Sequence, residues 1–255
     1  MRTIAIANNK GGTGKTSTAV NLAALLARDG ARVLLIDADP QHNSTDFFLD
    51  DASDIPTLYD VLEGTGETVW SDNVQPTAFK NLSILPADGN LFRLDLSALL
   101  NGSAVNDKRL FDFLRCARSD GETDYVVIDC PPGFTAASTA ALVCCDEVIV
   151  PTRADAFSRA GALELISQVN SLARYGVRPS FRVLVTMADR SRLSKQAEEQ
   201  LRRDGLSLFK TVIHSSVCVG ESSYARLPLY EYAPRSRAAQ DYEALLKEVL
   251  GDGEV

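Results

Sequence analysis

Short apolar runs alternate along this chain with stretches in which apolar residues recur at helical spacing. Seven runs are almost uniformly apolar and predict buried strands: Ile4–Ala7, Val33–Ile36, Leu82–Leu85, Tyr125–Ile128, Val148–Val150, Phe181–Val185 and Thr211–Ile213. The stretches between them predict helices at 15–29, 91–100, 106–117, 135–143, 158–175, 194–204 and 236–250. This alternation predicts an α/β fold, with a doubly wound, mostly parallel sheet that has helices on both faces. A sheet of this kind binds its ligands at the carboxyl ends of its strands.

The stretch at 44–80 is the least regular part of the chain. Acidic residues and a proline at 50–56, and the glycines at 64 and 66, interrupt any period. We interpret it as an insertion that carries one short helix at Leu58–Leu62 and serves either as a partner-contacting loop or as a solvated connection. The 255 residues are expected to form a single domain at 1–250, followed by a short acidic tail at 251–255.

Composition narrows the classes of partner and compartment. A hydrophobic content of 45% supports a substantial core, and the net charge of −8 leaves no global positive field for nucleic acid, so any DNA contact needs a local patch. The chain has no charged-then-apolar leader and no apolar stretch near the roughly 20 residues that a bilayer requires, so we expect a cytoplasmic protein without membrane attachment. Its five cysteines are odd in number and never spaced C-x-x-C, which disfavours disulfides and zinc.

The first strand is followed by a glycine-rich loop and then by an apolar helix. The loop reads Asn-Asn-Lys-Gly-Gly-Thr-Gly-Lys-Thr at 8–16. Glycines let the backbone turn its N–H groups around an anion, and the positive end of the following helix dipole holds that anion. Lys15 is then placed beside the β and γ phosphates of a nucleotide, and the Thr16 hydroxyl beside Mg²⁺. The alternative is a glycine-rich turn with two solvated lysines.

The loop departs from the strict phosphate-loop pattern, because Asn9 stands where the first glycine would be and Lys10 adds a second lysine. The segment resembles the deviant Walker A motif of the ParA/MinD ATPases. That resemblance implies a P-loop fold, ATP as the nucleotide, and a homodimer that forms on ATP binding, in which Lys10 reaches the partner's phosphates. It implies a nucleotide-binding set made of Lys10, Gly11, Gly12, Thr13, Gly14, Lys15, Thr16 and Ser17.

Two carboxylates, Asp37 and Asp39, follow the second strand at a spacing that points both to one face. Like charges at that spacing need a cation nearby, which Mg²⁺ with ATP would supply; the alternative is a solvated strand-end cap. The segment resembles switch I of the same family, D-x-D-P-Q-G-N. The resemblance implies that Asp39 orients the attacking water and that Asp37 supports the Mg²⁺ site. His42 stands where the family usually has glycine, and a bulkier residue there would change how the switch closes.

A third carboxylate, Asp129, ends the apolar strand Tyr125–Ile128 and precedes a stiff turn with two prolines and Gly133. Any strand can stop at an aspartate, but this segment resembles Walker B running into switch II. The resemblance implies that Asp129 holds Mg²⁺ through water and that the Gly133 N–H lies near the γ-phosphate. The predicted catalytic residues are Lys10, Lys15 and Asp39, and the predicted metal-site residues are Thr16, Asp37, Asp39 and Asp129.

The resemblance covers nearly the whole chain, about 1–248, and later segments favour ParA over MinD. Relatives bind DNA non-specifically through basic residues, several of which follow the strand that corresponds to Thr211–Ile213. Here 214–221 has serines and a cysteine where arginines are common. A substitute patch near 194–204 is predicted, with the alternative of a charge-rich solvated helix face. Its residues are Arg190, Arg192, Lys195, Arg202 and Arg203.

Three functions compete on these observations. The leading hypothesis is an ATP-dependent dimerising switch that segregates or positions plasmid or chromosomal DNA on the nucleoid, with hydrolysis stimulated by a ParB-like partner. The second keeps the ATPase but positions a protein cargo without DNA, or follows a MinD-like membrane cycle, which the acidic tail disfavours. The third is a metabolic P-loop enzyme of the same superfamily, such as an ATP-dependent ligase, whose later segments fit the sequence poorly.

Overall fold

The computed structural model describes residues 1–52, 54–64, 70–101, 108–189 and 191–251. Within them, eight strands form one sheet in the order β3-β4-β2-β5-β1-β6-β7-β8, and only the β3–β4 pair is antiparallel. The strands are β1 (Arg2–Ile6), β2 (Val33–Asp37), β3 (Gln75–Pro76), β4 (Leu82–Leu85), β5 (Tyr125–Asp129), β6 (Glu147–Arg153), β7 (Ser180–Ala188) and β8 (Leu208–His214). All seven predicted strands are present, and the predicted doubly wound fold is confirmed.

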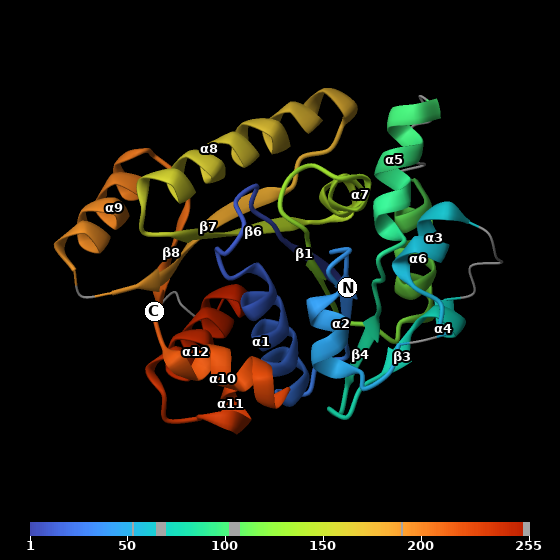
Figure 1. Cartoon of the computed structure of the whole chain (residues 1–255), viewed down its shortest axis with the longest axis horizontal. Helices are drawn as coiled ribbons and strands as arrows, with labels where there is room; N and C mark the ends of the chain where they lie inside the picture. Colours follow the sequence, from blue (N-terminus) through green and yellow to red (C-terminus); the bar gives the residue numbers. More distant parts are fainter. Residues whose placement is uncertain (53, 65–69, 102–107, 190, 252–255) are drawn as a thin grey trace.

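Helices cover both faces of this sheet (Figure 1). One face carries α1 (Lys15–Arg28), α2 (Asn43–Phe48), α10 (Val217–Ala225), α11 (Leu229–Tyr232) and α12 (Arg237–Leu250). The other carries α3 (Leu58–Glu63), α5 (Leu91–Asn101), α6 (Lys108–Asp120), α7 (Ala136–Cys144) and α8 (Ala156–Ser171). Two further helices, α4 (Trp70–Asn73) and α9 (Arg192–Arg203), lie near opposite ends of the sheet. Each strand between the layers is buried on both faces, which explains the uniformly apolar runs.

Some predictions need correction or fall outside the description. The stretch at 44–80 is more regular than predicted: besides α3 it contains α4, β3 and most of α2. The segment at 214–221 was not predicted to be helical, yet α10 begins there, capped by the Ser216 side chain, which accepts from the Cys218 N–H. The first two residues of the predicted helix 106–117, Arg190, and residues 252–255 of the predicted tail lie outside the described residues.

Strand order brings the predicted site residues together. β5 lies between β1 and β2, and the parallel register sets Asp129 level with Ile6 on one side and with Asp37 on the other. The loop after β1 therefore leaves the sheet beside both carboxylates. No helix among the described residues is both long and apolar enough to traverse a lipid bilayer.

A buried carboxylate joins three strands at the opposite, amino-terminal edge of the sheet. Glu147 accepts from Arg2 of β1 and from Arg182 Nε of β7 at 2.6 Å, and the Arg182 guanidinium lies 4.0 Å from the centre of the Phe209 ring. Arg2 also donates to the carbonyl of Val249 at 2.6 Å, which fastens α12 to this edge. Because Glu147 is buried and both arginines are partly exposed, this cluster contributes to stability mainly through the carboxylate.

We expect Glu147→Gln to lower the free energy of unfolding by about 2 kcal/mol or more, because it removes the charge that pairs with two arginines. Urea denaturation followed by circular dichroism measures this. Glu243→Gln is the matched control, since Glu243 pairs with Arg28 at an exposed position and the change should stay within about 0.5 kcal/mol. Equal effects of the two substitutions would contradict the role of burial.

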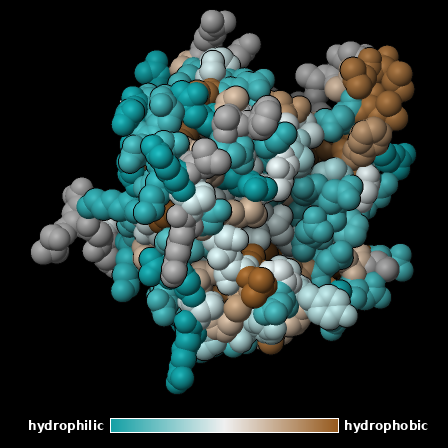
Figure 2. Space-filling model, turned by 60° about the vertical axis from the view of Figure 1, so that its left-hand side comes forward, coloured by the Kyte–Doolittle hydropathy of each residue, from teal (hydrophilic) through white to brown (hydrophobic). Residues whose placement is uncertain are grey.

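Helix α5 presents an apolar stripe to solvent. Phe92, Leu96, Leu99 and Leu100 recur at one helical face and are exposed, Leu99 by 82%. A hydrophobic patch stands at the upper right of Figure 2, where α5 rises from the body in Figure 1. On its inner side Leu91 and Leu94 pack in the core, so α5 carries apolar side chains on both its buried and its exposed face.

Candidate functional site

The glycine-rich loop forms an open cradle at the start of α1. Gly12 and Gly14 have φ of 71° and 87°, a region that side chains disfavour. Gly14 is the residue that precedes the helix, and it has no side chain to cap the first N–H groups of α1. Free N–H groups at the positive end of a helix bind anions, so the loop is built for a phosphate.

The two lysines of the loop have opposite environments. Lys15 is only 7% exposed, and its Nζ donates to the Lys10 carbonyl at 3.2 Å. Burial lowers the pKa of the Lys15 ammonium, against the opposing effect of the nearby Asp129 and Asp39 carboxylates. Lys10 is exposed, and its backbone packs against α8, where a Cβ at Gly161 would lie 3.3 Å from the Lys10 Cβ. Lys15 therefore serves the cradle from inside, whereas Lys10 is available to another molecule.

Residues that the sequence analysis missed hold this loop in place. The Asn8 amide donates to the carbonyl of Pro151 at 2.7 Å and its Oδ1 accepts from the Lys10 N–H at 2.9 Å. The Thr186 hydroxyl, at the end of β7, donates to the Thr13 carbonyl at 2.8 Å. Asn8 is the first polar residue after β1, a position where a buried amide must find partners, and that position was the available signal.

Asp37 and Asp129 lie side by side at the ends of neighbouring strands and are fully buried. Both oxygens of Asp37 are engaged: Oδ1 accepts from the Asp39 N–H at 3.1 Å, and Oδ2 from the N–H and hydroxyl of Thr45 at 2.8 Å each. The Asp39 carboxylate accepts from the Gln41 N–H at 2.9 Å. Asp37 thus holds both ends of the loop between Asp39 and Thr45 in place, which fits the supporting role expected for it.

Helix α2 carries two hydroxyls that the sequence analysis did not single out. Ser44 donates to Asp129 Oδ2 at 2.7 Å, and Thr45, bound to Asp37, also accepts from the Ala87 N–H at 2.9 Å. A six-residue helix is marginal by itself, so these contacts are what hold α2 in place. The signal in the sequence was a pair of hydroxyl residues, Ser44 and Thr45, directly after the switch motif.

The carboxylates fit a magnesium ion that a nucleotide helps to hold. Burial raises the pKa of Asp129, and burial together with the charge of Asp129 raises that of Asp37. Oδ1 of Asp129 is buried and has no hydrogen-bond partner among the described residues, as a ligand-facing oxygen would. Within the same residues, no three His, Cys, Asp or Glu side chains converge to hold a metal by themselves. Mg²⁺ usually takes one or two carboxylates with water and substrate phosphates. Of the four predicted metal-site residues, Asp37 has both oxygens engaged within the protein, whereas Thr16, Asp39 and Asp129 stay predicted partners of the ion.

We expect Ser44→Ala to raise the Mg²⁺ concentration for half-maximal ATP turnover by about 10-fold or more, as the loss of an outer hydrogen bond does at other metal sites. The Ser44 hydroxyl orients the Asp129 carboxylate, and its loss leaves that group free to turn. A Mg²⁺ titration at fixed ATP measures this. Ser83→Ala, on β4 away from this site, is the control; an unchanged Mg²⁺ requirement in Ser44→Ala would contradict the orienting role.

Two turns of the site each contain a residue whose backbone lies in the left-handed region. Gly133, after β5, has φ 89°, and its carbonyl accepts from the Ser138 hydroxyl at 3.0 Å near the start of α7. His42, before α2, has φ 45°, and its Nδ1 lies 3.2 Å from Asp46 Oδ1. His42 therefore occupies a conformation that suits glycine, at the position where the sequence departs from the switch I pattern.

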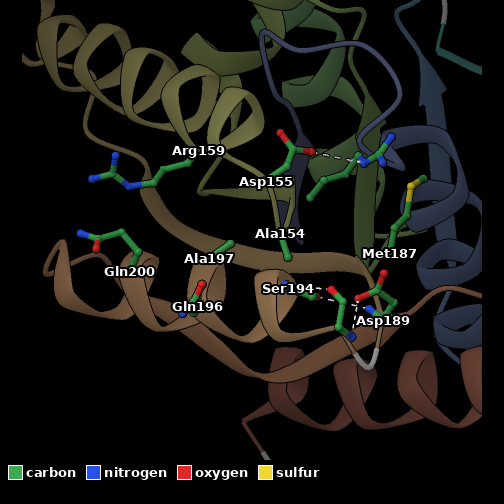
Figure 3. Close-up of a pocket in the computed structure, with 11 residues that line it drawn as sticks. Ala154, Asp155, Arg159, Met187, Asp189, Ser194, Gln196, Ala197 and Gln200 are labelled. Carbon is green, nitrogen blue, oxygen red and sulfur yellow. Dashed lines mark hydrogen bonds and ion pairs between the residues drawn. The ribbon is translucent and has the colours of Figure 1, made fainter.

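Met187 lines two cavities, and one of them adjoins the phosphate loop. One of about 320 Å³ opens beside Gly14 and Ser17, with Thr186, Met187 and Ser216 among its other walls. The larger, about 560 Å³, lies on the far side of Met187 between α8 and α9 (Figure 3). In it, Asp155 and Arg159 stand on the α8 side and Gln196, Ala197 and Gln200 on α9.

The basic residues predicted for DNA divide into two groups. Arg202 pairs with Glu198 at 2.8 Å and Arg203 with Glu199 at 3.5 Å, as on a solvated helix face. Arg192 and Lys195 are exposed and have no ion pair among the described residues. Lys195 also lines a cavity of about 380 Å³ together with Lys210 and Arg237, but Asp189, Glu198 and Asp241 line it as well, and Arg237 pairs with Asp241 at 3.0 Å. Of the predicted residues on α9, Arg192 and Lys195 are thus the ones that fit a basic patch.

Known proteins resemble this chain over most of its length. A family model described as an AAA domain matches residues 1–183. The chromosome partitioning protein ParA of Caulobacter vibrioides is 36% identical over 256 residues, covering 98% of this chain and 94% of that protein. An ATP complex of McdA(D38A) from Cyanothece has a TM-score of 0.85 at 27% identity, covering 100% of this chain and 98% of that one. Cobyrinic acid a,c-diamide synthase from Mycobacterium smegmatis, with bound ADP and magnesium, has a TM-score of 0.80 at 26% identity, covering 98% and 94%.

Proposed function

This chain belongs to the ParA-type partition ATPases of the ParA/MinD superfamily, and we propose that it is an ATP-dependent dimerising switch that segregates or positions DNA. The chain is an ATPase, and the predicted nucleotide ATP and metal Mg²⁺ are confirmed. A shared fold also occurs in a synthase, so the DNA-positioning function needs support from this chain's own residues. The dimerising switch is supported above all by the contrast between the two lysines of the loop: Lys15 is buried and Lys10 is exposed.

The contacts of each site residue suit a particular role in ATP hydrolysis. Phosphoryl transfer needs positioning and charge stabilisation more than covalent chemistry. Lys15 would neutralise the phosphate oxygens from within the loop, and the Gly133 N–H would donate to the γ-phosphate. Thr16 and Asp129 would hold Mg²⁺, which would supply charge stabilisation when bound. Asp39 orients the attacking water, because it is the site carboxylate that is not locked by α2.

Dimerisation follows from the exposed lysine. Lys10 is anchored at its backbone by Asn8 and by α8, while its side chain reaches solvent beside a cradle that Lys15 already serves. A second copy of the chain, facing the first across the nucleotides, would receive this charge at its own phosphates. Two nucleotides held between two subunits make the dimer dependent on ATP, and hydrolysis releases it.

DNA contact in this proposal uses a local basic surface on an acidic protein. Arg192 and Lys195 supply exposed charge at the start of α9. In a dimer the surface is doubled, which makes DNA affinity depend on ATP. Arg190 lies outside the described residues and stays a predicted contact. Binding through phosphates is independent of DNA sequence.

We expect DNA binding to require ATP and to fall steeply with salt. Lys195→Gln should weaken binding to all sequences alike and lower the slope of log K against log salt by about 1, since one phosphate contact is lost. Fluorescence anisotropy with a labelled random duplex, at several salt concentrations with and without ATP, measures both. Lys80→Gln is the control, because Lys80 is an exposed lysine on a distant loop. Binding that ignores ATP or salt would contradict the proposal.

A second candidate function is the positioning of a protein cargo without DNA. It is favoured by α10, the segment where relatives have arginines, because Val217 is 78% exposed and Tyr224 94% exposed on it. Exposed aromatic and aliphatic side chains suit a protein surface better than a phosphate backbone. The anisotropy experiment separates the two: an ATP dimer that fails to bind DNA at low salt would support the cargo function.

A further inference from the structure

The turn between Asp39 and helix α2 is closed by a residue in the left-handed region. His42 has φ 45° and ψ 33°, and its N–H donates to the Asp39 carbonyl at 2.8 Å. Glycine adopts this conformation freely and asparagine readily, whereas β-branched residues almost never do. Position 42 therefore accepts only residue types that tolerate a left-handed backbone.

The same turn determines where the Asp39 carboxylate lies. The Asp39 N–H donates to Asp37 Oδ1 at 3.1 Å, its Oδ1 accepts from the Gln41 N–H at 2.9 Å, and its carbonyl accepts from His42. The contacts from Gln41 and His42 both lie within the turn between Asp39 and His42. If the His42 backbone leaves the left-handed region while α2 stays anchored, this turn must rearrange, and the Asp39 carboxylate is displaced.

The far side of the turn is rigid. Immediately after His42, α2 is fixed by Ser44 to Asp129 and by Thr45 to Asp37, both in buried hydrogen bonds. The His42 carbonyl accepts from the Asp46 N–H at 2.9 Å, and its ring contacts the Asp46 carboxylate. A change of backbone at His42 therefore cannot be absorbed by α2 without breaking its anchors, and it is transmitted to Asp39.

We propose that His42 is a positioning residue for hydrolysis: its left-handed backbone holds the Asp39 carboxylate where it orients the attacking water. This inference rests on the role proposed above for Asp39. What position 42 must supply is the backbone conformation, and the imidazole adds only its contact with Asp46.

The test compares His42→Val, His42→Asn and His42→Gly in the full-length protein. His42→Val should lower kcat for ATP by about tenfold or more, because small misplacements of a catalytic group have effects of this size. His42→Asn and His42→Gly, which fit the left-handed region, should keep kcat within about threefold of the wild type. The Kd for a fluorescent ATP analogue should stay within about threefold in all three, since the cradle is built from other residues.

Asn81→Val is the matched control for strain. Asn81 is also left-handed, with φ 64°, but it lies before β4 at the amino-terminal edge of the sheet. This variant should lose thermal stability as His42→Val does, and yet keep its kcat. A melting curve for each variant shows that turnover is measured on folded protein.

Three results would overturn the inference: an unchanged kcat in His42→Val, an equal loss in His42→Gly, which would assign the effect to the imidazole, or an equal loss in Asn81→Val. Failure of the proposed function looks different, because then the wild type shows no turnover or Asp39→Ala retains it.

Discussion

Replacing Asp39 with alanine is expected to leave ATP binding intact and to lower ATP turnover by about 100-fold or more, as loss of a positioned general base or water-orienting group does. Asp39 makes its contacts within its own loop, and α2 stays anchored through Ser44 and Thr45, so the cradle should survive the change. Because the γ-phosphate is no longer cleaved, the variant should accumulate as the ATP-bound dimer. Phosphate release at saturating ATP measures the rate, and gel filtration with ATP measures the accumulation.

Asp50→Ala is the matched control for this experiment. Asp50 follows α2, is fully exposed and pairs with Arg226 at 3.0 Å, so its removal should change turnover less than about twofold, as expected for a surface ion pair. Turnover that stays at the wild-type rate in Asp39→Ala would show that another group orients the water. A variant that loses both turnover and ATP binding would mean that Asp39 builds the cradle itself.

Removal of the exposed lysine, in Lys10→Ala, should abolish dimerisation by ATP and with it nearly all turnover, a loss of about 1000-fold or more if Lys10 acts as charge supplied in trans. The monomer should still bind ATP, because Lys15 and the N–H groups of α1 remain in the same subunit. Fluorescent ATP titration measures the binding, and light scattering measures the dimer. Lys80→Ala, on an exposed loop, should match the wild type.

The outcome that contradicts this role is a Lys10→Ala protein that still dimerises with ATP. The contrast with Lys15→Ala adds a second criterion. Lys15 is buried in the loop, so its loss should abolish ATP binding in the monomer as well, whereas the loss of Lys10 should not. If both variants fail to bind ATP, the two lysines act in one subunit.

Strand positions were predictable because burial on both faces makes each strand uniformly apolar, as in Val33–Ile36 and Tyr125–Ile128. The long helices could be predicted from the periodicity of their apolar residues, but the positions of their ends depend on single residues. The predicted helix 158–175, for example, is α8 up to Ser171 and then a 3₁₀ turn that ends at Gly176, whose φ is 82°.

The short helix α3 was predicted, but α2 and α10 were not, because their stability depends on residues outside the helix. α2 has only six residues and depends on Asp37 and Asp129, which lie on two different strands. α10 is rich in serine, glycine and valine, which have modest helix propensity, and it forms through the Ser216 cap and its contacts with α11.

The nucleotide site was easier to predict than the surfaces around it. Asp37 and Asp129 end two neighbouring strands, and the loop that leads to Lys15 leaves the strand beside them, so strand order brings the three together. Ser44 and Thr186 join the site through side-chain hydrogen bonds that no local pattern reveals, and Gly161 joins it through the close approach of α8 to Lys10. The left-handed backbone of His42 likewise depends on what surrounds it, because the same residue is compatible with ordinary turns.

Sedimentation velocity in the Asp39→Ala background tests the sandwich dimer most directly, because slow hydrolysis keeps the ATP state populated. With ATP and Mg²⁺ the protein should sediment at twice the monomer mass of 27.6 kDa, and with ADP at the monomer mass. Adding the Lys10→Ala substitution should return the ATP sample to the monomer mass. A monomer in ATP with Lys10 intact, or a dimer in ATP without it, would contradict the closure of one subunit's lysine over the other's phosphates.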